Sequence, residues 1–197
     1  MANVDAPFGL RPLRYLNGAP WTGAATKYYV SSAGSNLFIG DPVDIQGTTD
    51  ATGKFPTVDK STLADGNYTL GPIVAIGPQE EDLTKTYLAS GGSDYVWVAD
   101  DPNLIFEIQC DSVAAIGIAD FGLNAIMVET HAGSTITGLS GIELDESSLA
   151  ADASQMLMCL RLVDRPDNEL ALHANVEVLI SMHRLGFSGA GDGRLGA

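Results

Sequence analysis

Apolar side chains recur at every second position in several stretches of this chain, and this period restricts the fold more than any other feature. In residues 104–110, Leu104, Phe106 and Ile108 alternate with Glu107 and Gln109. Successive side chains of a β-strand point to opposite faces, so the pattern predicts a strand with one buried and one polar face.

Two stretches nearer the C-terminus have the same period. The side chains expected to face the core are Met156, Met158, Leu160 and Leu162 in the first stretch, and Val176, Val178, Ile180 and Met182 in the second. Their polar neighbours are expected on the opposite face, together with Cys159 in the first stretch and His183 in the second.

Turn residues bound further short apolar runs, which are also predicted to be strands. These runs are 27–31, 37–39, 42–46, 68–76, 94–99 and 125–130. One short helix is predicted at 112–121, because Ser112 can cap its start and Gly122 can end it. A second helical turn is considered at 147–153.

About eight strands with one short helix and no strand–helix–strand rhythm predict an all-β sandwich or barrel, with the jelly roll as the preferred form. The order of the strands is left open. The expected division is an extended N-terminal arm at 1–24, a jelly-roll-like domain at 25–185 and a flexible glycine-rich tail at 186–197. Deletion of the arm is expected to leave the β fold intact.

The chain is strongly acidic, with a formal net charge of -15. Residues 61–160 contain fifteen Asp and Glu side chains and a single base, Lys85. A field of this sign repels phosphate backbones, so nucleic acid is not expected as a partner.

The N-terminal region has the opposite charge balance. Residues 1–27 contain three basic side chains, Arg11, Arg14 and Lys27, and one acidic side chain, Asp5. Three prolines and isolated apolar residues favour an extended segment lying on another surface. The contact residues predicted in this segment are Phe8, Arg11, Arg14, Tyr15 and Trp21. The alternative is that the aromatic side chains cover the core of their own chain.

No secretory signal or membrane span is expected, because no N-terminal apolar region and no run of about 18 apolar residues is present. Cys110 and Cys159 do not form a disulfide framework, and both lie in apolar strand patterns. We expect both thiols to be buried, reduced and inert.

No catalytic centre, cofactor or metal site is predicted. His131, His173 and His183 lack the spacing of metal ligands, and surface or interface positions are expected for them. Three acidic clusters could supply oxygens to a cation such as Ca²⁺, but solvated acidic loops are the preferred interpretation. These clusters are 80–82, 100–101 and 143–146. The chain is therefore expected not to be an enzyme.

Several short phrases follow one another along the chain. They are DAPFGLRP at 5–12, NG at 17–18, WTG at 21–23, FIGDPV at 38–43, GPIV at 71–74, YVWVADDP at 95–102, FEIQ at 106–109, FGLN at 121–124, GS at 133–134 and TG at 137–138. In this order, these phrases resemble the capsid cement (head decoration) proteins of podovirus-like tailed bacteriophages. Longer loops and the glycine-rich tail set this chain apart from the smallest members.

The resemblance implies a homodimer or homotrimer on the outer surface of the virion, assembled in the host cytoplasm. Its partner would be the major capsid protein, whose neighbouring subunits it would clamp. One alternative is an adhesin or carbohydrate-binding module on the virion, which exposed Tyr87, Tyr95 and Trp97 on one sheet face would favour. Another is a metal-dependent barrel enzyme, which converging histidines would favour.

Overall fold

The computed structural model describes residues 3–79 and 82–186, so most of the expected tail and two of the acidic residues at 80–82 lie outside the described residues. The described strands are β1 (Arg11–Tyr15), β2 (Thr26–Val30), β3 (Pro42–Thr49), β4 (Pro56–Lys60), β5 (Gly71–Ile76), β6 (Asp94–Val98), β7 (Leu104–Gln109), β8 (Asn124–Ala125), β9 (Met127–Glu129), β10 (Ile142–Leu144), β11 (Leu157–Leu162) and β12 (Asn175–Ile180). The all-β prediction is confirmed.

Five strands form a sheet in the order β1-β7-β12-β11-β8, in which every neighbouring pair is antiparallel. The β9–β10 pair packs across the inner face of this sheet, and their side chains share one buried core. We call this part the sheet unit. It contains the strand from the N-terminus and the six strands from β7 onward.

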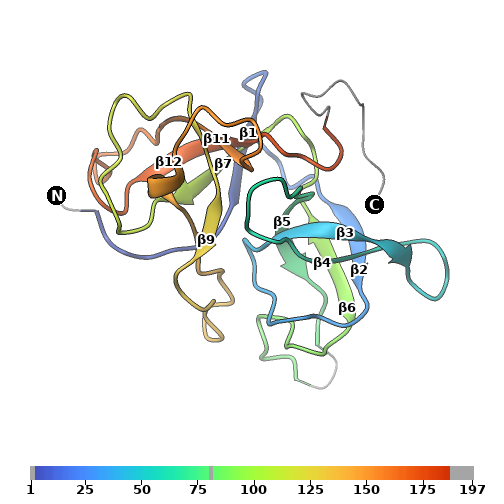
Figure 1. Ribbon diagram of the computed structural model, residues 1–197. Coiled ribbons are helices and arrows are strands. Elements are labelled where there is room, and N and C mark those ends of the chain that lie inside the picture. The colour runs from blue at the N-terminus through green and yellow to red at the C-terminus, as the bar shows by residue number, and fades with distance from the viewer. Residues whose placement is uncertain (1–2, 80–81, 187–197) are drawn as a thin grey trace.

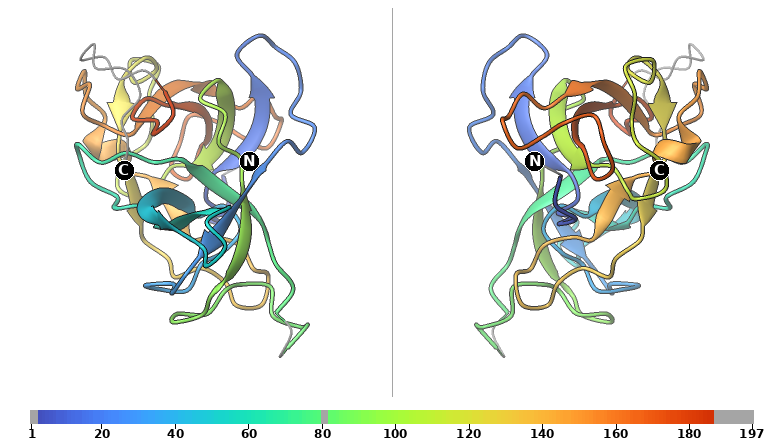
Figure 2. Two further views of the ribbon diagram at one scale, coloured as in Figure 1. Left: turned by 90° about the vertical axis from the view of Figure 1, so that its right-hand side faces the viewer. Right: turned by 90° about the vertical axis from the view of Figure 1, so that its left-hand side faces the viewer.

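The remaining strands, β2 to β6, close into a barrel in the order β2-β4-β3-β5-β6. The barrel has its own core, which includes Val30, Val58, Ile73 and Val96. All of its strands lie between β1 and β7, which pair directly with each other. The chain thus leaves the sheet after its first strand, builds the barrel beside it and returns (Figures 1 and 2). Residues 25–185 therefore contain two cores rather than one.

The predicted helix at 112–121 is wrong, because this segment is an irregular loop. Gly117 interrupts it, and the Gly117 amide donates to the Asp120 carboxylate at 2.7 Å instead of to a helical carbonyl. Among the described residues, the helical structure is one 3₁₀ turn, Glu146–Ser148 (η1), which overlaps the start of the turn considered at 147–153. None of the described helical structure is long and apolar enough to cross a membrane.

The N-terminal region is not an arm separate from the fold. Arg11–Tyr15 is an edge strand of the sheet, and Leu10 is only 2% exposed. The chain then reverses in a turn in which the Gly18 amide donates to the Tyr15 carbonyl. Pro12 is tolerated in this strand because β1 lies at the edge of the sheet.

Alternation placed some side chains on the wrong face. In β11, Leu157 and Cys159 are fully buried, whereas Met158 and Leu160 are only partly buried. The pairing with β12 is also irregular after Cys159. In β7 all six residues are buried, including Glu107. Glu107 is buried at only 2% exposure, so its carboxylate needs partners within the protein.

Candidate binding groove

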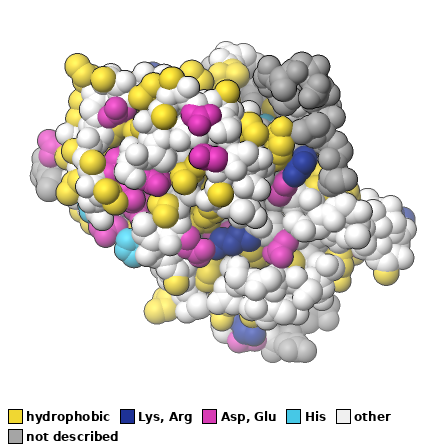
Figure 3. Space-filling view, viewed as in Figure 1, with side chains coloured by type: hydrophobic (Ala, Val, Ile, Leu, Met, Phe, Trp, Pro, Cys, Tyr) yellow, Lys and Arg dark blue, Asp and Glu magenta, His cyan; other side chains and the backbone are white. Residues whose placement is uncertain are grey.

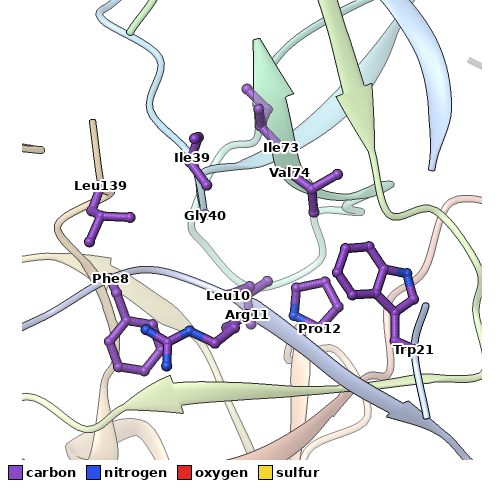
Figure 4. Close-up of a pocket in the computed structure, with 10 residues that line it drawn as sticks. All are labelled: Phe8, Leu10, Arg11, Pro12, Trp21, Ile39, Gly40, Ile73, Val74 and Leu139. Atoms are coloured by element: carbon purple, nitrogen blue, oxygen red, sulfur yellow. The ribbon is translucent and has the colours of Figure 1, made fainter. Parts of the chain in front are cut away.

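Three of the five predicted contact residues, Phe8, Arg11 and Trp21, border one apolar groove between the N-terminal segment and the barrel (Figure 4). The other lining residues are Leu10, Pro12, Ile39, Gly40, Ile73, Val74 and Leu139. The hollow has a volume of about 170 Å³. A cavity of about 150 Å³ can hold benzene, so this one can take one or two partner side chains.

Two glycines bring the walls of the groove together. Gly9 has φ +72° and Gly40 has φ +95°, which L residues with side chains rarely adopt. A Cβ atom on Gly40 would lie 2.2 Å from the Phe8 carbonyl oxygen. The Leu10 amide donates to the Gly40 carbonyl at 2.9 Å, so backbone from the sheet unit and backbone from the barrel meet directly.

Phe8 and Arg11 form one end of the groove. The Arg11 guanidinium lies over the Phe8 ring, 4.1 Å from its centroid (Figure 4). It also lies 3.7 Å from the Glu107 carboxylate. Arg11 remains 51% exposed. Because Arg165 lies 2.7 Å from the other Glu107 oxygen, Arg11 can engage a partner without leaving that buried carboxylate unpaired.

Trp21 forms the other end. Its indole nitrogen donates to the Ala24 carbonyl at 2.9 Å, which fixes the orientation of the ring. Trp21 and Val74 also border a neighbouring hollow that reaches Trp97. Phe8, Arg11 and Leu139 border a third hollow, which reaches His131. The three hollows share these side chains and form one continuous strip, which we call the seam groove.

The other two predicted contact residues lie elsewhere. Arg14 donates to Glu177 at 2.6 Å, within an ion-pair cluster that also contains Arg161. Burial raises the pKa of Glu177, but hydrogen bonds from Arg161 and Arg14 outweigh this and hold it below its usual value. Tyr15 packs on the core of the sheet unit and borders a hollow that is separate from the groove. Arg14 is thus committed to its own chain.

A group of aromatic side chains lies on the outside of the barrel. Val96 and Val98 point into the barrel and are fully buried, so the alternating Tyr95 and Trp97 point outward. Lys27 lies over both rings, 3.8 Å from the Tyr95 centroid and 5.6 Å from that of Trp97. Tyr87, which was considered together with them, stacks instead on Phe38 at 5.3 Å.

The histidines occupy three different settings. His131 is half exposed, and its ring lies 3.2 Å from Glu143 and 3.7 Å from Asp5. His173 lies 3.7 Å from Asp5 on the other side. His183 is only 4% exposed, so the predicted surface position is wrong for it. A parallel bridge pairs His183 with Thr69, which lies just before β5.

Both cysteines are buried and free, as expected. Burial is the main reason that the pKa of the Cys159 thiol rises to about 12, and that of Cys110 rises as well. The thiolate is the reactive form, so both side chains are chemically protected in the folded protein.

The acidic clusters separate in space. Asp100 accepts hydrogen bonds from Thr26 and Tyr28, and Asp101 caps a local turn at Asn103. In the cluster at 143–146, Glu143 turns toward His131, whereas Asp145 and Glu146 lie against Asp111. Asp111 was not connected with this cluster from the sequence, because it is more than thirty positions away.

On the face shown in Figure 3, Asp and Glu side chains appear at several separate places, and Lys and Arg at fewer. A comparison of the chain with protein-family models, curated proteins and solved structures found no match.

Proposed function

We propose that this protein is a virion structural protein that cements the head of a tailed bacteriophage. It binds the outer surface of the shell as a homo-oligomer and holds neighbouring subunits of the major capsid protein together. The observation that carries the proposal is the seam groove, in which Phe8 and Trp21 lie at opposite ends of an apolar strip. The resemblance to cement proteins supports the identity of the partner.

The occupant of the groove is an extended apolar segment of a capsid subunit. Large aromatic side chains and arginine carry most of the binding energy in protein interfaces, and Phe8, Arg11 and Trp21 are of this kind. The walls are held by backbone contacts between the two units, so little ordering is needed when the segment binds.

The net charge of the protein also supports binding to a capsid subunit, provided that the surface around the apolar segment is basic. The net charge of -15 attracts basic surfaces and accelerates encounter with them. A contact of this kind weakens with salt, whereas burial in the apolar groove does not. An oligomer that binds several capsid subunits at once gains a high effective concentration, so each single contact can be weak.

The outward-facing Tyr95 and Trp97 favour a second function, that of a carbohydrate-binding module on the virion. Sugar rings stack on aromatic faces, and these two side chains share one face of β6. Lys27 covers part of both rings, so a sugar would have to displace it or pair with it. A glycan array tests this alternative, with Trp97→Ala as the variant expected to lose any signal.

Co-sedimentation with expanded, undecorated phage heads tests the cement function. The expected result is saturable binding, and shells that withstand a higher temperature before they rupture. Phe8→Ala and Trp21→Ala are each expected to weaken binding by about 10-fold or more, the range found for interface anchors.

Leu16→Ala is the matched control, because Leu16 is 51% exposed in the same N-terminal segment but outside the groove. Its binding should equal that of the wild type. No saturable binding to heads contradicts the cement function. Binding that is unchanged in the Phe8 and Trp21 variants contradicts the assignment of the groove.

A further inference from the structure

The ends of two strands bring a group of carboxylates together in the sheet unit. Just beyond β7, Cys110 forms a parallel bridge with Leu144 at the end of β10. The Asp111 amide donates to the Leu144 carbonyl at 3.0 Å. The two segments leave this parallel bridge in the same direction, so Asp111 and Asp145 lie side by side. Glu146 is the next residue after Asp145.

Oxygens of Asp111, Asp145 and Glu146 lie within 4.8 Å of one another. Asp111 is 3% exposed and Glu146 is 6% exposed, so this is not a solvated acidic loop. Burial raises the pKa of Asp111, and the negative charge of Asp145 adds to the effect.

The partners that the chain supplies leave part of this group unsatisfied. One Glu146 oxygen, Oε1, accepts the amide of Ala114, but Oε2 is buried without a hydrogen-bond partner in the described structure. Asp145 uses Oδ1 for the amide and hydroxyl of Ser147, at 3.0 and 2.6 Å. Among the residues at 3–79 and 82–186, no Lys or Arg nitrogen lies within 4.0 Å of these three carboxylates.

An isolated buried carboxylate is costly, and three that converge repel one another unless a positive charge lies between them. We propose that Asp111, Asp145 and Glu146 bind a divalent cation, and that this cation is Ca²⁺. The donors are all carboxylate oxygens, without the imidazole or thiolate that favours Zn²⁺. Ca²⁺ also accepts irregular sets of oxygens, completed by backbone carbonyls and water.

The cation would fix the loop at 112–123, which leaves the sheet directly after Asp111. Ala114 in this loop already contacts Glu146, and Ile116 is anchored in the core. Val113 and Ile118 are 68% and 82% exposed on the same loop. Binding at its base would hold the loop in one conformation. This inference does not depend on the proposed function, since it concerns the folding of the isolated chain.

Calorimetric titration of the full chain with CaCl₂, after treatment with a chelator, tests the site. The expected result is saturable binding of one Ca²⁺ per chain in the micromolar to millimolar range, with weaker binding of Mg²⁺. The midpoint of thermal unfolding should rise with the Ca²⁺ concentration, since a ligand that binds only the folded state stabilises it. Glu146→Gln and Asp145→Asn should each weaken binding about 10-fold or more.

Asp152→Asn is the matched control. Like Asp145, Asp152 accepts hydrogen bonds from the amide and hydroxyl of a serine two positions further on, at 2.9 and 2.7 Å. Among the residues that the structure describes, it belongs to no carboxylate cluster. This variant should bind Ca²⁺ as the wild type does. Circular dichroism confirms that each variant is folded, and Asp145→Asn serves where Glu146→Gln does not fold.

Two results would overturn the proposal. One is the absence of both binding heat and a thermal shift at about 10 mM Ca²⁺, a concentration about tenfold above the dissociation constant of the weakest protein sites. The other is binding that persists unchanged in the Asp145 and Glu146 variants. If a shared proton relieves the repulsion instead, these variants become more stable without Ca²⁺ and the wild type does not respond to the ion.

Discussion

The Leu10 amide donates to the Gly40 carbonyl at 2.9 Å, and this bond joins the N-terminal segment to the barrel. The two backbones can approach so closely because both Gly9 and Gly40 lack a Cβ atom. The seam groove lies directly over this contact. The shape of the groove and the packing of the two units therefore depend on the same few atoms.

Gly40→Ala is expected to destabilise the protein strongly. The new Cβ would lie 2.2 Å from the Phe8 carbonyl oxygen, and the residue would keep φ +95°. Gly53→Ala is the matched control, because Gly53 also has positive φ, +70°, but has no atom within 4 Å of its Cβ position.

Urea unfolding measures both variants. Backbone strain alone should cost the control about 1 kcal/mol. The clash should add about 1–3 kcal/mol for Gly40→Ala, as overpacking usually does. Equal losses in the two variants would show that the close contact is not important for stability.

Leu10→Ala should reduce the free energy of unfolding by about 2–5 kcal/mol, the range for a buried leucine. Leu10 is 2% exposed within the core of the sheet unit, although it precedes the first strand. Leu16→Ala, at a position that is 51% exposed, should cost less than about 0.5 kcal/mol. Denaturant melts compare the two, and a small loss for Leu10→Ala would indicate that the N-terminal segment detaches easily.

Because Leu10 is buried in the core, removal of the N-terminal segment would affect folding as well as binding. Removal of residues 1–24 would delete β1 and the buried Leu10 along with Phe8 and Trp21. Such a protein is expected to be unstable, contrary to the sequence-based expectation for this segment. Single substitutions in the groove therefore separate binding from folding better than a deletion does.

Period-two alternation was sufficient to predict the class of fold and most of the long strands, because it reports directly on burial. It failed where both faces of a strand are covered. Glu107 looked like a solvated residue, but it is 2% exposed, and Arg165 and Arg11 neutralise its buried charge. No local pattern shows that basic residues so distant in sequence will meet one glutamate.

The groove was predictable only in part. Aromatic residues among prolines pointed to Phe8 and Trp21, but the opposite wall comes from Ile39, Ile73 and Val74 in the barrel. Strands β1, β4 and β10 were missed because each is short, and β1 and β4 also contain a proline. The insertion of the barrel between β1 and β7 depends on a pairing of distant segments, which sequence periodicity does not encode.

Protonation of the Glu177 carboxylate should contribute to the unfolding of the protein in acid. Its folded pKa is lowered, so its contribution to stability is fully present above the unfolded value of 4.5 and is lost as pH falls through the lower folded value. Arg14→Gln removes one of the partners that lower this pKa. The acid-unfolding transition should then move to higher pH.

The loss of stability at neutral pH should be about 1–3 kcal/mol, as for a hydrogen bond to a charged group. Thermal melts between about pH 3 and pH 7 cover this titration. Lys54→Gln is the control, because Lys54 is an exposed cation outside the cluster. A transition that shifts equally in both variants would reflect the change in net charge and not the pair with Glu177.

Cys110 and Cys159 should resist thiol reagents until the protein unfolds. Both side chains are fully buried, and burial raises the pKa of Cys159 to about 12, so almost no thiolate is present at pH 8. Reaction with a chromogenic disulfide reagent at pH 8 should therefore be slow in buffer and rapid in concentrated urea, with two thiols per chain released. If labelling in buffer follows the rate of global unfolding, the thiols are protected by the whole sheet unit. Fast labelling of one thiol in buffer would instead indicate that β11 or the end of β7 opens locally, which would also expose the carboxylates that follow Cys110.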